Sequence, residues 1–169
     1  MVQVGDIERV VRDCLNIIGV SAGDCVFGVY DCGSIDVRGG AGAYVFFDDS
    51  GGVYYVGEAD DVARRLLQEH CRADIGGSEG VVRFLMHYLD EICANSGEWA
   101  GLDAVGREEF VKKILREKIS GFKIYVVTCE KLSDGKQGNR RVRNRVRKRL
   151  EDCLRGGGLR PMLNSIGVS

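Results

Sequence analysis

The chain of 169 residues has no long apolar run, one proline, two histidines and a net charge of only −1. No apolar stretch approaches the ~20 residues that a membrane-spanning helix needs, which argues against a membrane protein. The N-terminus carries acids and lacks the basic start and apolar block of a signal peptide. We therefore expect a cytoplasmic protein that does not contact a membrane.

The seven cysteines form no CxxC pair, and only His70 and His87 are present to complete a zinc site. This argues against a structural metal. Their odd number and the lack of a secretion signal favour reduced, mostly buried thiols, unless the source is thermophilic. No cysteine has an evident histidine partner in the local sequence, so none is predicted as a nucleophile.

The small net charge conceals a strongly basic segment. Residues 136 to 149 contain eight lysines and arginines and no acid, so the acids are concentrated elsewhere.

A chain of this length, with 44% hydrophobic residues, can bury one core but is too short for two large domains. We expect a single globular domain over residues 1–169.

The most informative stretch runs from Gly42 to His70. Two β-branched and aromatic runs, 44–47 and 53–56, flank the turn residues 48–52, which predicts a β-hairpin. Gly57 is predicted to end the second strand. A helix then follows, with apolar residues at three- and four-residue spacing and an aspartate at its start as the cap.

Periodicity predicts the remaining elements, and no internal repeat is visible. In order, they are a helix over 5–18, a strand over 25–30 that could add to the sheet edge, helices over 79–94 and 107–119, a strand over 122–132, and a basic helix over 139–154. The basic helix has one narrow apolar stripe made of Val142, Val146, Leu150 and Leu154. Its arginines occupy the remaining circumference.

The hairpin resembles the GIY-YIG nuclease family. The two half-motifs are Gly42-Ala43-Tyr44 and Tyr55-Val56-Gly57, and Arg65 follows Gly57 by eight residues. The resemblance covers roughly 42–66 and 122–164. It implies an α/β (α+β) fold with a small antiparallel three-stranded sheet flanked by helices. Residues 1–40 would be an N-terminal helix and strand extension to a core over 42–164, and about 79–119 a helical insertion before the third core strand.

The resemblance also implies an activity, that of a metal-dependent DNA endonuclease, a hydrolase of phosphodiester bonds that uses Mg²⁺ or Mn²⁺. Arg65 would bind the scissile phosphate through its planar fork of donors. Tyr44 and Tyr55 would place hydroxyls near the attacking water, and Glu151 would hold the metal. Asn164 would fix the geometry through its amide.

Each of these residues also has an ordinary structural interpretation. Strand tyrosines often fill a core, Arg65 can pair with Glu69 at i+4, and Glu151 can pair with Arg147 at i−4. The position relative to the hairpin favours the catalytic interpretation.

Two acids depart from the family pattern. Glu69 stands where family members commonly have Tyr or His, and His70 comes one step later, about 100° further around an α-helix. His70 is either a displaced general base or a solvated helix residue. Glu58 follows Gly57, where Lys or a small polar residue is common. These acids lie near the expected phosphate site, so the alternative is a catalytically inactive or altered GIY-YIG-fold module that binds nucleic acid.

The expected partner is DNA, with RNA not excluded and the oligomeric state open. Arg140, Arg141, Arg145 and Lys148 on the basic helix are the candidates for phosphate contacts, which would make binding steeply dependent on salt. A further interpretation is that this helix contacts an acidic protein.

Overall fold

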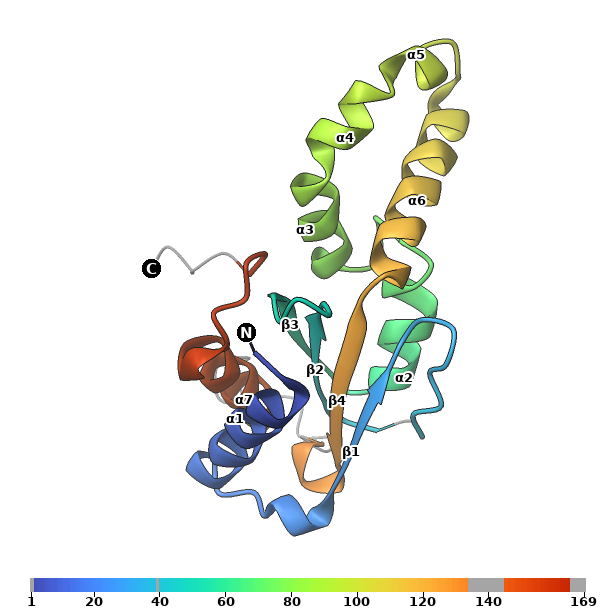
Figure 1. The fold of residues 1–169 in the computed structure, drawn as a ribbon. Helices are drawn as coiled ribbons and strands as arrows, with labels where there is room; N and C mark the ends of the chain where they lie inside the picture. Colours follow the sequence, from blue (N-terminus) through green and yellow to red (C-terminus); the bar gives the residue numbers. More distant parts are fainter. Residues whose placement is uncertain (1, 39, 134–144, 165–169) are drawn as a thin grey trace.

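A four-stranded antiparallel sheet forms the centre of the protein (Figure 1). The computed structural model describes residues 2–38, 40–133 and 145–164. The strands are β1 (Cys25–Tyr30), β2 (Gly42–Phe47), β3 (Val53–Ala59) and β4 (Lys123–Cys129), in the spatial order β1-β4-β2-β3. The strands β2 and β4, far apart in sequence, are thus neighbours in the middle of the sheet.

Helices lie on both sides of this sheet. They are α1 (Val4–Ile17), α2 (Val62–Arg64), α3 (Glu79–His87), α4 (Leu89–Ala94), α5 (Ser96–Trp99), α6 (Ala104–Ser120) and α7 (Val146–Leu154). Two π-helical segments, η2 (Arg65–His70) and η5 (Arg155–Leu159), continue α2 and α7, and η1 (Ala22–Asp24) and η3 (Glu130–Leu132) are short 3₁₀ turns. Within the described ranges, no helix is both long enough and apolar enough to cross a bilayer.

The sheet separates two hydrophobic clusters. Val45 and Phe47 of β2 point to the face covered by α1 and α7, whereas Tyr44 and Phe46 point to the face covered by η2, α3 and α6. All six residues of β2 are buried, as expected for a central strand with both faces covered. Figure 1 shows α1 and α7 side by side on one face and α2 on the other.

The α/β class and the antiparallel hairpin are confirmed. The sheet has four strands because β1, the strand expected at the sheet edge, pairs with β4 along its whole length, from Cys25 opposite Cys129 to Tyr30 opposite Ile124. The prediction that Gly57 ends the second strand is wrong. The β2–β3 ladder continues to Gly42 opposite Ala59.

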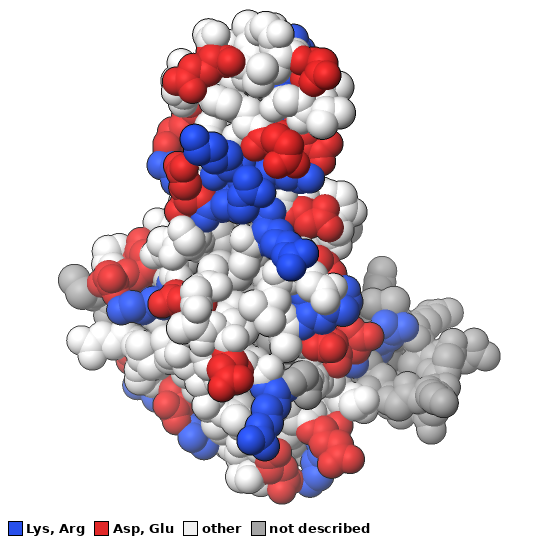
Figure 2. All heavy atoms as spheres, turned by 90° about the vertical axis from the view of Figure 1, so that its right-hand side faces the viewer, with Lys and Arg blue, Asp and Glu red and all other residues white. Residues whose placement is uncertain are grey.

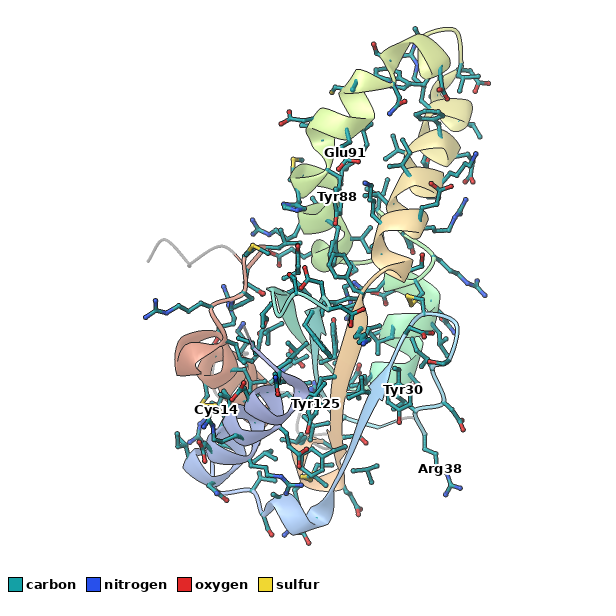
Figure 3. All side chains as sticks on the ribbon, viewed as in Figure 1. Cys14, Tyr30, Arg38, Tyr88, Glu91 and Tyr125 are labelled. Carbon is teal, nitrogen blue, oxygen red and sulfur yellow. A yellow bond between two sulfur atoms is a disulfide. The ribbon has the colours of Figure 1, made fainter. Side chains whose placement is uncertain are left out.

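The insertion after η2 forms a helical hairpin that projects from one end of the sheet (Figure 1). The helix predicted over 79–94 is broken at Tyr88 into α3 and α4, and one turn of helix, α5, lies between the two helices predicted for this region. Tyr88 and Glu91 point towards α6 (Figure 3), where the Lys118 ammonium pairs with Glu91 and lies 5.2 Å from the Tyr88 ring centroid. These contacts hold the two arms of the hairpin together.

The basic helix begins later than predicted. Its first described residue in helical conformation is Val146, since Arg145 is the N-cap with an extended backbone (φ −68°, ψ 137°). Arg145 therefore does not share a helix face with Lys148, and Arg140 and Arg141 lie outside the described residues. Leu150 and Leu154 are fully buried, which confirms the inward stripe at these positions.

The prediction of reduced cysteines is wrong for six of the seven, and only Cys93 is a free thiol. Three disulfides join α1 to α7 (Cys14–Cys153), β1 to β4 (Cys25–Cys129) and the loop after β1 to the end of η2 (Cys32–Cys71). The paired residues are 139, 104 and 39 positions apart in sequence. No local spacing motif can reveal such pairs, because only the fold brings them together.

Candidate active site

The residues predicted for the site come from separate segments and meet around β3. Tyr44 lies on β2, Tyr55 on β3, and Arg65 and His70 on η2. Glu151 lies on α7, and its charge acts on both tyrosines. Asn164 comes from the segment that follows η5.

The centre of the site is a buried pair, Tyr44 and His70. The Tyr44 hydroxyl lies 2.9 Å from Nε2 of His70, and the imidazole is fully buried. Burial raises the pKa of Tyr44 well above its ordinary value, the neighbouring Tyr55 raises it further, and the charge of Arg65 lowers it. Burial, followed by the charge of Arg65, lowers the pKa of His70 to about 3. Both groups are therefore neutral at pH 7.

His70 is buried and faces Tyr44, so the expectation of a solvated helix residue is wrong. The local helix type explains this orientation. Residues Arg65–His70 form a π-helix, in which hydrogen bonds run from i+5 to i, as from the Cys71 amide to the Leu66 carbonyl at 2.9 Å. A π-helix accommodates more residues per turn than the α-helix assumed from sequence. The 100° estimate for His70 therefore does not apply, and its ring contacts Tyr44, Phe46 and Tyr55.

Both glycines of the half-motifs are required by close packing. A Cβ on Gly57 would lie 2.5 Å from the Tyr44 hydroxyl, so this glycine leaves room for the tyrosine ring. A Cβ on Gly42 would lie 1.9 Å from the Val127 carbonyl oxygen of β4. The glycines thus allow the tyrosine and the neighbouring strand to approach the backbone.

Arg65 forms the ion pair with Glu69 that its i+4 spacing suggests. Its Nη1 donates to Glu69 Oε2 at 2.6 Å and to the Gly77 carbonyl at 3.4 Å. The other carboxylate oxygen of Glu69 accepts from Arg64 at 2.8 Å. Arg65 Nε, His70 Nδ1 and the Tyr125 hydroxyl are the buried side-chain polar atoms without a hydrogen-bond partner in the described part of the chain. Two of these three atoms belong to this site.

Glu58, the second departure from the family pattern, is also paired. Its Oε2 accepts from Arg147 Nε at 2.7 Å, and the Arg147 side chain is only 8% exposed. Arg147 also donates to the Leu132 carbonyl at 3.3 Å. This contact ties β3 to α7 and neutralises the acid, so Glu58 does not stand as an isolated negative charge beside the site.

Glu151 is largely buried on α7, with a side chain that is 10% exposed. Its carboxylate pairs with Lys148 and lies 4.0 Å from Arg155 Nη1. Burial raises the pKa of Glu151, and the charge of Glu58 adds to this, while Lys148 and Arg155 oppose it. Burial is the main cause that raises the pKa of Tyr55, and the charge of the Glu151 carboxylate raises it further.

No group of three or more His, Cys, Asp or Glu side chains in residues 2–38, 40–133 and 145–164 could hold a metal ion. A magnesium ion that keeps most of its waters needs fewer protein ligands. The Glu151 carboxylate fits that requirement, since burial leaves it in need of a counter-charge, a role that Lys148 fills in this structure. A divalent ion would compete with the Lys148 ammonium for this carboxylate.

Asn164 binds the backbone of β3 through both ends of its amide. Its Oδ1 accepts from the Val56 amide at 2.7 Å and its Nδ2 donates to the Val56 carbonyl at 2.8 Å. The preceding residues Met162 and Leu163 donate to the carbonyls of Val53 and Tyr54. This segment therefore covers the outer edge of β3, next to the half-motif Tyr55-Val56-Gly57.

The first turn of the insertion also contributes to the site, which the sequence did not suggest. Ser78 Oγ lies 3.4 Å from His70 Nε2, and the charge of Glu79 raises the pKa of Tyr55. A Cβ on Gly80 would lie 2.4 Å from the His70 ring. The sequence Gly77-Ser78-Glu79-Gly80, small residues around a helix start, was the one signal that could have indicated close packing.

No family model, curated protein or solved structure matches the chain. The GIY-YIG assignment therefore stays a prediction.

Proposed function

We propose that this protein is a metal-dependent endonuclease of the GIY-YIG type that hydrolyses phosphodiester bonds in DNA. The observation that supports it best is the meeting of a buried tyrosine–histidine pair with one arginine and one carboxylate at β3. The electrostatic influence of Arg65 and Glu151 reaches Tyr44 although the three residues come from η2, α7 and β2. Metal-dependent hydrolysis of a phosphodiester uses such groups together, namely a held water, a cation at the phosphate and a carboxylate for the metal.

In this proposal, Tyr44 holds the attacking water. Its hydroxyl is fixed by His70 at 2.9 Å, and both groups are neutral before reaction. The pair thus orients water by hydrogen bonding and does not carry a charge. Tyr55, whose ring centroid lies 6.3 Å from that of Tyr44, completes the wall of the site.

Arg65 stabilises the charge that develops on the phosphate, because a guanidinium remains protonated at neutral pH and presents a planar set of donors. Glu151 would hold Mg²⁺ or Mn²⁺, which would supply charge neutralisation and assist the leaving oxygen. Asn164 would fix β3 through its two bonds to Val56.

A second candidate is a module of the same fold that binds nucleic acid without cutting it. The contacts of Glu151 with Lys148 and of Arg65 with Glu69 favour this candidate, since both key charges already have a partner of opposite sign.

A cytosolic location stays a prediction for either candidate. The three disulfides limit this prediction to a hyperthermophilic source, because stable disulfides are rare in the cytosol of other cells.

The deciding experiment uses purified full-length protein, supercoiled plasmid and Mg²⁺ or Mn²⁺, with EDTA as the control. The proposal expects nicked and linear products that appear only with the divalent ion. Binding in a gel-shift assay without any product would favour the second candidate. A protein that neither cuts nor binds DNA contradicts both.

Salt dependence locates the DNA surface. Changing Arg141, Arg145 and Lys148 together to glutamine should reduce the slope of log affinity against log salt, by up to about 0.9 for each phosphate of duplex DNA that the variant no longer neutralises. Figure 2 shows lysine and arginine side chains gathered on the helical insertion, with acids around them. An unchanged slope would therefore move the DNA surface to this insertion, where the charge of Lys112 is offset by Glu108 at 2.6 Å.

A further inference from the structure

Glu69 lies buried between two arginines of the candidate site. The residue is 7% exposed, and its two carboxylate oxygens accept hydrogen bonds from different guanidinium groups, Arg64 at 2.8 Å and Arg65 at 2.6 Å. A carboxylate with both oxygens engaged in this way holds two long side chains in one arrangement. The three side chains together keep one net positive charge.

The contact leaves one edge of the Arg65 guanidinium uncommitted. Nη1 is held by Glu69 and by the Gly77 carbonyl, whereas Nε is buried and has no hydrogen-bond partner among the described residues. A guanidinium is planar, so fixing Nη1 also fixes the direction of the Nε and Nη2 edge. Because Nε is buried, a phosphate of DNA can meet only the exposed part of the guanidinium, and the Arg65 side chain is 28% exposed.

The backbone holds Glu69 firmly. Its carbonyl accepts from the Asp74 amide at 2.9 Å, an i+5 bond that extends the π-helical pattern. Two residues beyond Glu69, Cys71 is joined by a disulfide to Cys32 of the loop after β1. The carboxylate is thus fixed by the helix that bears it as well as by its two partners.

We propose that Glu69 is a positioning residue that orients Arg65, so that the exposed part of its guanidinium engages a single phosphate of the DNA backbone. This inference rests on the proposed nuclease function. Glu69 itself touches no substrate. The acid that departs from the family pattern is then part of the phosphate site and does not obstruct it.

The test compares Glu69→Gln with Glu8→Gln, a matched control in which an i, i+4 pair with Arg12 at 2.7 Å is removed on α1, on the opposite face of the sheet. Misplacing a group by about 1 Å costs about 10²-fold in rate. We expect kcat for plasmid cleavage to fall by about that factor in Glu69→Gln, with DNA affinity unchanged or tighter because one negative charge is removed. The control should keep wild-type kcat and affinity.

Three outcomes would overturn the proposal. An unchanged kcat means that Arg65 does not depend on Glu69, and a raised kcat means that Glu69 blocks the site. Parallel loss of kcat and of DNA affinity indicates a role in folding only. If Glu69→Gln does not fold, Glu69→Asp keeps the charge but shortens its reach, and the same separation of kcat from affinity is expected.

A second readout does not depend on cleavage. The Arg65 Nε–H resonance, assigned by its disappearance in Arg65→Lys, is followed by NMR as inorganic phosphate is added. It should shift in the wild type and in Glu8→Gln but not in Glu69→Gln. A wild-type protein that does not cut DNA would end the nuclease proposal, while this titration still decides the role of Glu69. Equal shifts in wild type and Glu69→Gln would refute it.

Discussion

His70 should make the stability of the protein depend on pH. In the folded state burial holds its pKa at about 3, against 6.5 in the unfolded chain. Between these values the unfolded chain binds a proton that the folded protein does not, so the free energy of unfolding rises with pH. The contribution is complete above pH 6.5 and is lost as the pH falls towards 3. The slope approaches about 1.4 kcal/mol per pH unit well below pH 6.5, and because the unfolded imidazole is half protonated at pH 6.5, the change between pH 6.5 and 4.5 is about 2 kcal/mol.

Replacing His70 with glutamine removes this titration while keeping an amide that can bond to the Tyr44 hydroxyl. Urea unfolding followed by circular dichroism at pH 7.5, 6.5, 5.5 and 4.5 gives the free energy of unfolding for both proteins. Other titrating groups, such as Glu151, are present in both and cancel in the difference. The wild type should lose about 2 kcal/mol more than the variant between pH 6.5 and 4.5. Parallel pH profiles would show that the imidazole is not held neutral in the folded protein.

Three further substitutions test the site. Arg65→Ala should lower the rate of plasmid cleavage by about 10² to 10³-fold and leave the circular dichroism spectrum unchanged, because its contact strengthens in the transition state; wild-type rates would contradict its assignment. Glu151→Gln should abolish activity at every Mg²⁺ concentration, whereas Asp152→Asn, which removes the neighbouring partner of Lys148, should keep a normal Mg²⁺ response. Gly57→Ala should lower the free energy of unfolding by about 1 to 3 kcal/mol in a urea titration, since its Cβ would lie 2.5 Å from the neighbouring tyrosine hydroxyl, and a neutral effect would contradict that packing.

The hairpin and the strand at the sheet edge could be predicted because their signals are local. Residues 44–47 and 53–56 are apolar runs around turn residues, and 25–30 forms β1 with the predicted bounds. Asp61 caps the following helix by accepting from the Arg64 amide at 3.0 Å, as the sequence indicated. Tyr44, Arg65 and Glu151 are named from the resemblance to the GIY-YIG family, and the charges of Arg65 and Glu151 both act on the Tyr44 hydroxyl in the structure.

The features that escaped prediction depend on tertiary contacts. Propensity does not distinguish an α-helix from a π-helix, so the contact of His70 with Tyr44 could not be foreseen. Whether Glu58 and Glu69 oppose phosphate binding depends on the residues that pair with them. The partner of Glu58 is Arg147, which lies 89 positions away and cannot be found from local sequence. The insertion packs Ser78 and Gly80 against the histidine, although the sequence marks it only as an apolar helical segment.

The disulfide between Cys14 and Cys153 closes a covalent loop between two residues that are 139 positions apart in sequence. Every peptide bond between these two cysteines lies within the closed loop, including those of the projecting helical hairpin. A protease that cuts once at α5 therefore opens the ring without releasing a fragment. The β2–β3 hairpin and α7, which carry the two halves of the candidate site, stay tethered after such a cut. Only a reductant separates the two pieces on a denaturing gel.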